Sequence, residues 1–323
     1  MKNIIALVLT AVILMAYSCG SGSKKKEKDA NTTDLKGNIS ISGAFALYPL
    51  AQKWAEEFCE IYPDVKIDVS AGGAGKGMTD ALSELVNLGM VSREITKEEI
   101  DKGAWFVPVT KDAVVPVINE NNPALQYLVN KGLTKETLQE IYLTGKITDW
   151  GTAVGKKTIT GKINVYTRSD ACGAADVWAK YLGEKQEDLL GTAVSGDPGV
   201  TEAVKNDKLG IGFNNIGYAY DATTKYVTAG IKILPIDFNG NGIIDDNEYF
   251  YQKKDSIVKA ISDGRFPSPP ARDLYFVCKG KPDNEIVVAF LKWILTDGQK
   301  YISEAGYINL TDEKIKAALE KLQ

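Results

Sequence analysis

Apolar residues along this chain follow two periods in turn. Residues 38–42 carry an apolar side chain at every second position, which predicts a strand, and residues 47–58 carry them at helical spacing. The same succession recurs further along, with strands predicted at 66–70, 87–91 and 162–167 and helices at 78–85 and 174–182. Strands that alternate with helices are typical of parallel sheets flanked by helices, so the pattern predicts an α/β fold.

Two long extended stretches interrupt this alternation. Residues 105–118 and 271–279 are each long enough to run from one lobe of a protein into another. Two such crossings between two α/β lobes are typical of hinged binding proteins that close around a ligand. We therefore expect mixed sheets flanked by helices in two lobes, with a hinge of two crossing segments. Lobe I is predicted to comprise residues 37–112 and 274–323, and lobe II residues 113–273.

The residues before position 37 are predicted to lie outside these lobes. Lys2 and the apolar run 4–16 are typical of a secretory signal peptide, residues 1–18, whose apolar part is too short to span a membrane. Cys19 follows small residues, as in bacterial lipoproteins, so we expect an acylated N-terminus there; a plain signal peptide with a chance cysteine is the alternative. Residues 19–36 are polar and predict a flexible tether. The protein is then anchored by lipid on the extracytoplasmic side of the cell envelope.

Composition and charge argue against several function classes. The net charge is −4, and the only basic block lies at 24–26, so nucleic acid is not an expected partner. The chain has no His, which removes the commonest general base and every Ser-His or Cys-His nucleophile, so we do not expect an enzyme. Cys59, Cys172 and Cys278 are widely spaced, form no zinc motif and are expected to be free thiols.

Three predicted strand-to-helix loops, at 42–47, 70–77 and 167–174, are poor in bulky charged side chains. In sheets of this class, ligands bind at the carboxyl ends of the strands, where unpaired N–H groups of the following helices favour anions. Arg168 at the start of the third loop adds a planar cation that suits an oxyanion. The three loops together predict an anion site; ordinary tight turns are the alternative.

In this order and spacing, the chain after residue 37 resembles the type II periplasmic solute-binding proteins, specifically the phosphate-binding receptors of ABC importers. The landmarks of the resemblance are 43–49 leading to Trp54, 72–77, 87–93, 168–174, 210–213, 272–275, 298–299 and 306–307. The resemblance implies a monomeric receptor that captures an oxyanion, foremost inorganic phosphate, and delivers it to an ABC permease. The ligand-binding positions that it implies are Phe45, Ala46, Ala74, Ser92, Arg93, Arg168, Cys172, Gly173 and Ala174.

This chain departs from the family at several of those positions. The family usually has hydroxyl residues where Phe45, Ala74, Cys172 and Ala174 stand, and it often has an acid near Arg93. Four lost hydrogen bonds to a charged ligand would cost about 6–12 kcal/mol, on the order of 10⁴ to 10⁸ in affinity. Three alternatives therefore stay open: a receptor for a neutral or organic ligand, an enzyme with Cys172 as nucleophile, and a calcium-stabilised structural lipoprotein.

Residues 237–248 match a twelve-residue calcium loop. Oxygen ligands are expected from Asp237, Asn239, Asn241, the carbonyl of Ile243, Asp245 and Glu248, with Gly242 at the sharp turn. The preceding residues 231–236 look like a strand, because Pro235 argues against an entering helix. Only three ligands are carboxylates, so we expect modest calcium affinity and a structural role; sensing, or an Asn-Gly turn followed by an acidic loop, are the alternatives.

Overall fold

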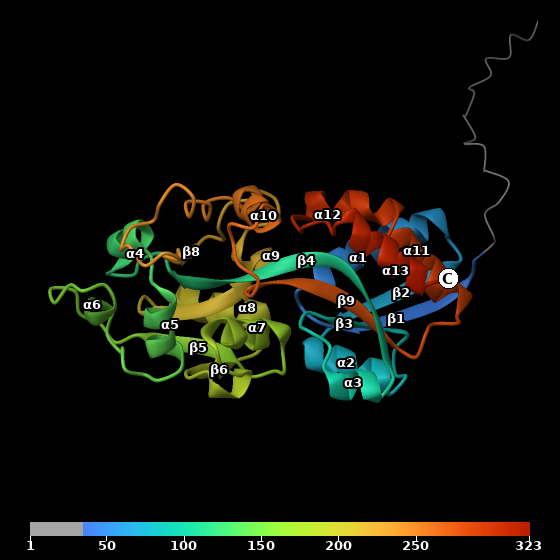
Figure 1. Cartoon of the computed structure of the whole chain (residues 1–323), viewed down its shortest axis with the longest axis horizontal. Helices are drawn as coiled ribbons and strands as arrows, with labels where there is room; N and C mark the ends of the chain where they lie inside the picture. The colour runs from blue at the N-terminus through green and yellow to red at the C-terminus, as the bar shows by residue number, and fades with distance from the viewer. Residues whose placement is uncertain (1–34) are drawn as a thin grey trace, which may run out of the picture. The chain divides into compact units, whose positions relative to one another are not determined.

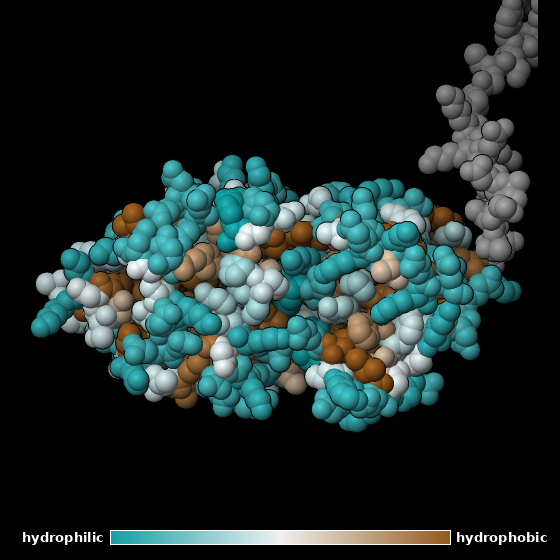
Figure 2. Space-filling view, in the orientation of Figure 1, coloured by the Kyte–Doolittle hydropathy of each residue, from teal (hydrophilic) through white to brown (hydrophobic). Residues whose placement is uncertain are grey.

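The computed structural model describes residues 35–323. The predicted signal peptide, Cys19 and the predicted tether up to residue 34 lie outside the described residues. Leu35 is buried and packs in a hydrophobic core, so core packing extends two residues before the predicted start of lobe I at 37. Within residues 35–323 no helix is long and apolar enough to cross a membrane. Figure 2 shows hydrophilic side chains over most of one face of this unit, with smaller hydrophobic areas between them.

The strands form one mixed sheet in the order β2-β1-β3-β9-β4-β7-β5-β6, with β8 also paired to β4. The pairs β1–β2, β1–β3, β5–β6 and β5–β7 are parallel, and those that involve β4 or β9 are antiparallel. The strands are β1 Gly37–Gly43, β2 Val65–Ala71, β3 Leu88–Val91, β4 Ala104–Asn119, β5 Asn164–Arg168, β6 Thr192–Val194, β7 Gly210–Asn215, β8 Ile231–Ile233 and β9 Ala271–Lys279. The predicted α/β fold with mixed sheets is confirmed.

Helices flank this sheet (Figure 1). They are α1 Tyr48–Ile61, α2 Ala74–Leu82, α3 Lys97–Asp101, α4 Leu125–Lys131, α5 Lys135–Tyr142, α6 Trp150–Ala153, α7 Gly173–Leu182, α8 Gly196–Asn206, α9 Ile216–Ala219, α10 Lys254–Ser262, α11 Glu285–Ile294, α12 Lys300–Ala305 and α13 Asp312–Lys321. Two 3₁₀ turns lie at Gln186–Asp188 and Asp297–Gln299. The second predicted helix ends three residues early, at Leu82, because Glu84 takes a positive φ that a helix does not allow, and Leu85 is exposed.

The long strands β4 and β9 join the two parts of the sheet, as Figure 1 shows. Residues 104–113 of β4 pair with β9, with a bulge between Pro108 and Thr110. The rest of β4 leaves β9 and pairs with β7 and β8. Both extended crossing segments predicted from the sequence are therefore strands. β4 pairs with strands in both parts of the sheet.

Among residues 35–323, three hydrophobic cores lie along the sheet. One is built only from residues before 110 and after 273, and it includes Trp54 and Phe276, whose rings are 6.3 Å apart. The other two are built from residues 113–271 with Ile308, around aromatic side chains such as Trp178 and Phe213. Below, lobe I and lobe II denote the residue ranges proposed from the sequence, 37–112 with 274–323 and 113–273.

Candidate anion site

The predicted ligand residues come from loops at the carboxyl ends of β1, β2, β3 and β5. The loops after β1, β2 and β5 lead into α1, α2 and α7, so helix N-termini lie at this edge of the sheet. Within residues 35–323, the backbone N–H groups of Ala46, Ala74, Gly173 and Ala174 have no hydrogen-bond acceptor. Unpaired N–H groups in the first turn of a helix carry partial positive charge and attract anions. The edge therefore presents backbone donors that do not depend on side-chain identity.

The loops of the two lobes touch at this edge. The N–H of Gly75, in the first turn of α2, donates a 2.9 Å hydrogen bond to the carbonyl oxygen of Ala171, in the loop before α7. Gly173 lies against Ser92 at the end of β3, where a Cβ on Gly173 would come within 2.2 Å of the Ser92 carbonyl oxygen. Only glycine allows this approach of the two backbones. The structure thus brings Ala74, Ser92, Gly173 and their neighbours together from both lobes.

Phe45 crosses from the loop before α1 to cover lobe II residues. Its ring lies 5.4 Å from the guanidinium carbon of Arg168, and it meets Tyr218 edge to face at 6.5 Å. The Tyr218 hydroxyl donates to the carbonyl of Phe45 at 3.3 Å, and the Tyr307 hydroxyl donates to the carbonyl of Ala46 at 2.8 Å. An aromatic ring and two tyrosines therefore fix this loop, at a position where the resemblance implied a hydroxyl residue.

Arg168 is paired with two carboxylates of its own chain. Its side chain is 1% exposed and forms 2.7 Å ion pairs with Asp170 and with Asp197. Burial by itself would lower the pKa of Arg168, but Asp197 and Asp170 outweigh that effect and raise the pKa above its ordinary value. One cation and two anions give these three side chains a net charge of −1. The guanidinium that the sequence predicts as an anion ligand is therefore already held by two carboxylates of the same chain.

Arg93 is also occupied. Its guanidinium donates to both carboxylate oxygens of Glu99, at 2.9 and 2.6 Å. Glu99 in turn belongs to the capping box of α3, where it accepts from the N–H of Thr96. Hydrogen bonding to Glu99 raises the pKa of Arg93 against the opposing effect of burial. Arg93 therefore holds α3 to the end of β3, whereas Ser92 beside it faces Gly173 of lobe II.

Cys172 caps the N-terminus of α7. Its Sγ accepts the N–H of Ala175 at 3.3 Å, and its own N–H donates to Oε1 of Gln186 at 3.3 Å. Burial raises the pKa of the Cys172 thiol to about 12, with Arg168 opposing the shift. The side chain is therefore protonated at neutral pH and buried, which argues against a nucleophilic role. Within residues 35–323, Cys59, Cys172 and Cys278 are free thiols, as predicted.

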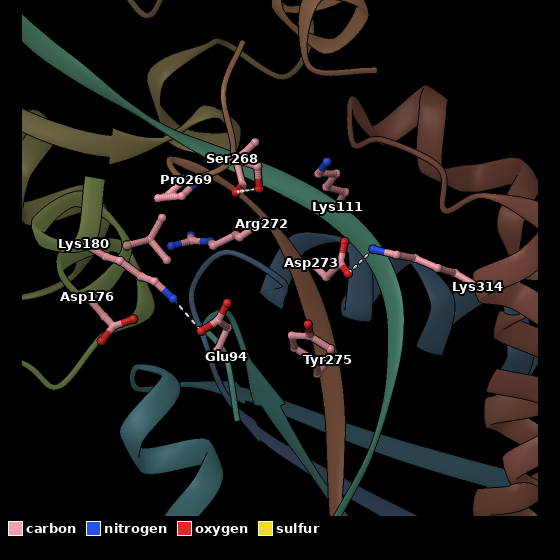
Figure 3. Close-up of a pocket in the computed structure, with 12 residues that line it drawn as sticks. Glu94, Lys111, Asp176, Lys180, Ser268, Pro269, Arg272, Asp273, Tyr275 and Lys314 are labelled. Carbon is pink, nitrogen blue, oxygen red and sulfur yellow. Dashed lines mark hydrogen bonds and ion pairs between the residues drawn. The ribbon is translucent and has the colours of Figure 1, made fainter. Parts of the chain in front are cut away.

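A polar cavity of about 190 Å³ lies beside α7 and β9, and none of the predicted ligand residues lines it. Figure 3 shows Lys180 of α7 paired with Glu94 of lobe I across the cavity, and Lys314 paired with Asp273. The guanidinium of Arg272 also lines the cavity, and it donates to the carbonyl of Gly173. Arg272 thereby links this cavity to the first turn of α7.

The comparison with protein families identifies the chain. Residues 28–298 match a family model described as the PBP superfamily domain. This chain belongs to the PBP superfamily. The phosphate-binding protein PstS of Staphylococcus aureus strain USA300 is 25% identical over 316 residues, which cover 96% of this chain and 88% of that protein. PstS of Staphylococcus epidermidis is 26% identical and covers 98% of this chain and 92% of that protein. The resemblance to PstS-like type II binding proteins is thus confirmed.

Solved structures show the same fold. A phosphate ABC transporter substrate-binding protein from Clostridium perfringens, crystallised with bound phosphate, has a TM-score of 0.68 and 24% identity, and covers 85% of this chain and 100% of that chain. An ABC-type phosphate transport receptor from Vibrio cholerae has a TM-score of 0.60 and 22% identity, with 84% of this chain and 100% of that chain covered. At this identity the likeness establishes the fold and leaves the ligand to be argued from the site.

The structure places four polar residues that were not predicted as site residues next to Arg168 or the first turn of α7. Asp170 and Asp197 pair with Arg168, and Asp197 also accepts from the side-chain amide of Asn215 at 2.7 Å. Arg272 donates to Oδ1 of Asn215 and to the carbonyl of Gly173. Asp170 stands only two positions after Arg168, so this pairing could have been predicted from the sequence. Asp197 and Asn215 could not be predicted, because only the fold places them beside the loop.

Proposed function

We propose that this PBP-superfamily protein is an extracytoplasmic receptor that captures inorganic phosphate and delivers it to an ABC transporter. Curated relatives that span nearly the whole chain are named phosphate-binding protein PstS. The phosphate ABC transporter substrate-binding protein of Clostridium perfringens, which has the same fold, carries bound phosphate. Capture needs no covalent step, which agrees with a buried, protonated Cys172 and with the lack of His.

The observation that carries this proposal is the set of unpaired N–H groups at the first turns of α2 and α7. The hydrogen bond from Gly75 to Ala171 holds these two turns together. A tetrahedral oxyanion between them would accept hydrogen bonds from Ala74, Gly173 and Ala174 of the two lobes. Each bond to a charged group contributes roughly 1.5–3 kcal/mol, so these three donors together contribute about 4.5–9 kcal/mol, which reaches micromolar affinity at its upper end.

The protein is proposed to act as a monomer tethered to the cell envelope. A signal peptide at 1–18, acylation of Cys19 and a polar tether would keep the receptor near its permease while its lobes stay in solution. Mass spectrometry of the N-terminal peptide of the mature protein tests this part, since an unmodified residue after position 18, or cleavage elsewhere, would refute it. The result is independent of whether phosphate binds.

Isothermal titration tests the phosphate proposal directly. The full chain is purified in phosphate-free buffer, dialysed exhaustively and titrated with phosphate, sulfate, molybdate and tungstate. We expect phosphate to give saturable heat at micromolar or lower concentration and to compete with any other anion that binds. Tight binding of sulfate, with none of phosphate, would reassign the ligand. Absence of heat from all four anions would refute an oxyanion receptor.

A neutral or organic ligand is the second candidate, and the ion pairs of Arg168 favour it. Asp170 and Asp197 already neutralise that cation, and the Phe45 ring covers it, so the site is less cationic and more apolar than the sequence predicted. Native mass spectrometry of protein purified from its own host would reveal a co-purified organic molecule. Displacement of that molecule by phosphate would return the assignment to the first proposal.

A further inference from the structure

The loop 237–248 lies between β8 and α10 in lobe II and takes no part in the anion site. Oxygen-bearing side chains stand at all five of its side-chain ligand positions, 1, 3, 5, 9 and 12, with Gly242 at position 6 in a left-handed conformation of φ 81°. This spacing and the glycine are those of a twelve-residue calcium loop. A β-branched or bulky residue at position 6 could not make the same turn.

The loop buries two carboxylates that have no cationic partner. Asp237 is 3% exposed and Glu248 is 5% exposed. None of the ion pairs found in residues 35–323 involves either side chain. Other buried acids of this protein, such as Asp197, do have a basic partner. Buried carboxylates are normally paired with a cation or bound to a metal, so this pair points to a missing positive charge.

The side chains of the loop converge on one another. Asp237 accepts from the N–H groups of Gly240 and Gly242, at 2.7 and 2.9 Å. The amides of Asn239 and Asn241 both reach Oδ2 of Asp245, at 2.8 and 2.9 Å. Positions 1, 3, 5 and 9 are thus oriented within one small loop. Each oxygen of Asp237 accepts one hydrogen bond and keeps a second lone pair for a cation, whereas Oδ2 of Asp245 accepts both amides, which leaves Oδ1 of Asp245 for a cation.

Glu248 closes the loop from its far end. Its two oxygens accept from the N–H of Phe238, at 2.8 Å, and from the N–H of Asp245, at 3.3 Å. The acids alone do not make a metal cluster: within residues 35–323 no three His, Cys, Asp or Glu side chains group closely enough to hold an ion. A cation here would need the amide oxygens and a backbone carbonyl as well, which is the mixed oxygen set that calcium accepts and zinc does not.

We propose that residues 237–248 bind one calcium ion. The ligands are the side chains of Asp237, Asn239, Asn241, Asp245 and Glu248 and the backbone carbonyl of Ile243. Three carboxylates and two amides place the dissociation constant on the order of 10⁻⁴ to 10⁻³ M, the range of extracellular calcium modules. Magnesium is disfavoured because it demands a smaller, more regular octahedron.

The contacts of the loop show what calcium would stabilise. Ile244, between two ligand positions, donates its N–H to the carbonyl of Asn130 at the end of α4, at 2.9 Å. The N–H of Asp237 donates to the carbonyl of Leu133, at 3.1 Å. Phe238 packs edge to face on Phe266, at 5.9 Å. A bound ion would therefore fasten the segment after β8 to α4 and to the aromatic core of lobe II.

The test is calcium titration of the full chain in detergent after removal of metals with a chelator. Calorimetry measures calcium binding, and terbium luminescence excited through nearby tyrosines gives a second signal. Glu248→Gln removes one carboxylate, and Asn241→Asp adds one at loop position 5. Asp246→Asn is the matched control, because Asp246 is an exposed acid of the same loop at a position that supplies no ligand.

We expect one site, with affinity at least about tenfold weaker in Glu248→Gln, tighter in Asn241→Asp and unchanged in Asp246→Asn. About 10 mM calcium should raise the melting temperature of the wild type by roughly 3–8 °C. If Glu248→Gln folds poorly, the calcium affinity of Asn241→Asp still tests the proposal. Absence of binding to the wild type, or equal affinity in all the variants, would overturn the proposal. Phosphate binding is measured in parallel and should be the same in Asp246→Asn and Asn241→Asp.

Discussion

The backbone of Gly173, at the first turn of α7, lies directly against Ser92 at the end of β3. A Cβ on Gly173 would come within 2.2 Å of the carbonyl oxygen of Ser92 and 2.4 Å of its hydroxyl oxygen. The two residues come from different predicted lobes, so this contact joins the two residue ranges. Because a Cβ at position 173 would push Ser92 away, a substitution of Gly173 tests whether ligand binding needs this contact.

Gly173→Ala should weaken ligand binding with little effect on the three hydrophobic cores. Overpacking of this kind costs about 1–3 kcal/mol, which is roughly a 5- to 150-fold loss of affinity. Gly199→Ala in α8 is the control, because a Cβ there meets its nearest neighbour, Val194, at an ordinary 3.7 Å. Phosphate titration and thermal unfolding measure both effects. Full phosphate affinity in Gly173→Ala would show that the contact is not needed for binding.

The two arginines of the predicted site should behave differently. Arg168→Ala leaves the buried Asp197 and its neighbour Asp170 without a cation, so we expect stability to fall by about 3–5 kcal/mol and phosphate affinity by roughly 100-fold or more. Arg93→Ala removes the pairing with Glu99 and one hydrogen bond to the carbonyl of Glu94, so affinity should stay within about threefold. Arg168→Lys keeps the charge without the forked geometry, so its phosphate affinity should lie between those of Arg168→Ala and Arg93→Ala. Equal losses in Arg93→Ala and Arg168→Ala would restore Arg93 as a ligand residue.

Sequence periodicity located the elements that carry the site. The alternating apolar residues of β1 and β2 and the buried stripe of α1, from Leu50 to Phe58, have no competing interpretation. The long strands β4 and β9 were recognisable because each is extended over more residues than a single lobe needs. The end of α2 was not recognisable, since Leu85 continues the apolar spacing although the chain has already turned at Glu84.

The electrostatics of the site could not be predicted from the sequence. Asp197, which pairs with Arg168, stands 29 positions away, and nothing local distinguishes it from other acids at helix starts. Arg93 looked free because Glu99 reaches it only through the turn that begins α3. Whether two charged side chains pair depends on the distance between their ends in the folded chain. The spacing of apolar residues along the sequence does not specify that distance. The positions of the loops were therefore predictable, and their net charge was not.

Asp112 at the crossing of β4 and β9 should make stability depend on pH. Burial raises its pKa from the ordinary 3.8 to about 6, with Arg272, the backbone N–H of Ala113 and Lys254 opposing the shift and Asp197 adding to it. The closest cation is Nη2 of Arg272, 3.5 Å from Oδ2. Because the folded state holds this proton more tightly than the unfolded state, the contribution of Asp112 is greatest below about pH 4. It is lost as pH rises to about 6.

Asp112→Asn removes this contribution, which amounts to about 3 kcal/mol across the whole shift. The free energy of unfolding, measured by denaturant titration between pH 4 and 7, should fall less steeply with rising pH in Asp112→Asn than in the wild type. Asp246→Asn, at an exposed acid, serves as the control. Identical pH profiles for the wild type and Asp112→Asn would mean that Asp112 is ionised throughout this range.

Cys172→Ser places a hydroxyl at the N-terminus of α7 and should strengthen phosphate binding. Cys172 caps α7 through Sγ, and a serine hydroxyl in its place is a stronger cap and adds one O–H donor beside the unpaired N–H groups of Gly173 and Ala174. One hydrogen bond to a charged ligand contributes roughly 1.5–3 kcal/mol, so phosphate affinity should rise about 10- to 100-fold. Cys278→Ser, at a buried thiol of lobe I, is the matched control and should only lower stability. Unchanged phosphate affinity with a raised melting temperature would confine Cys172 to helix capping and favour a ligand other than phosphate.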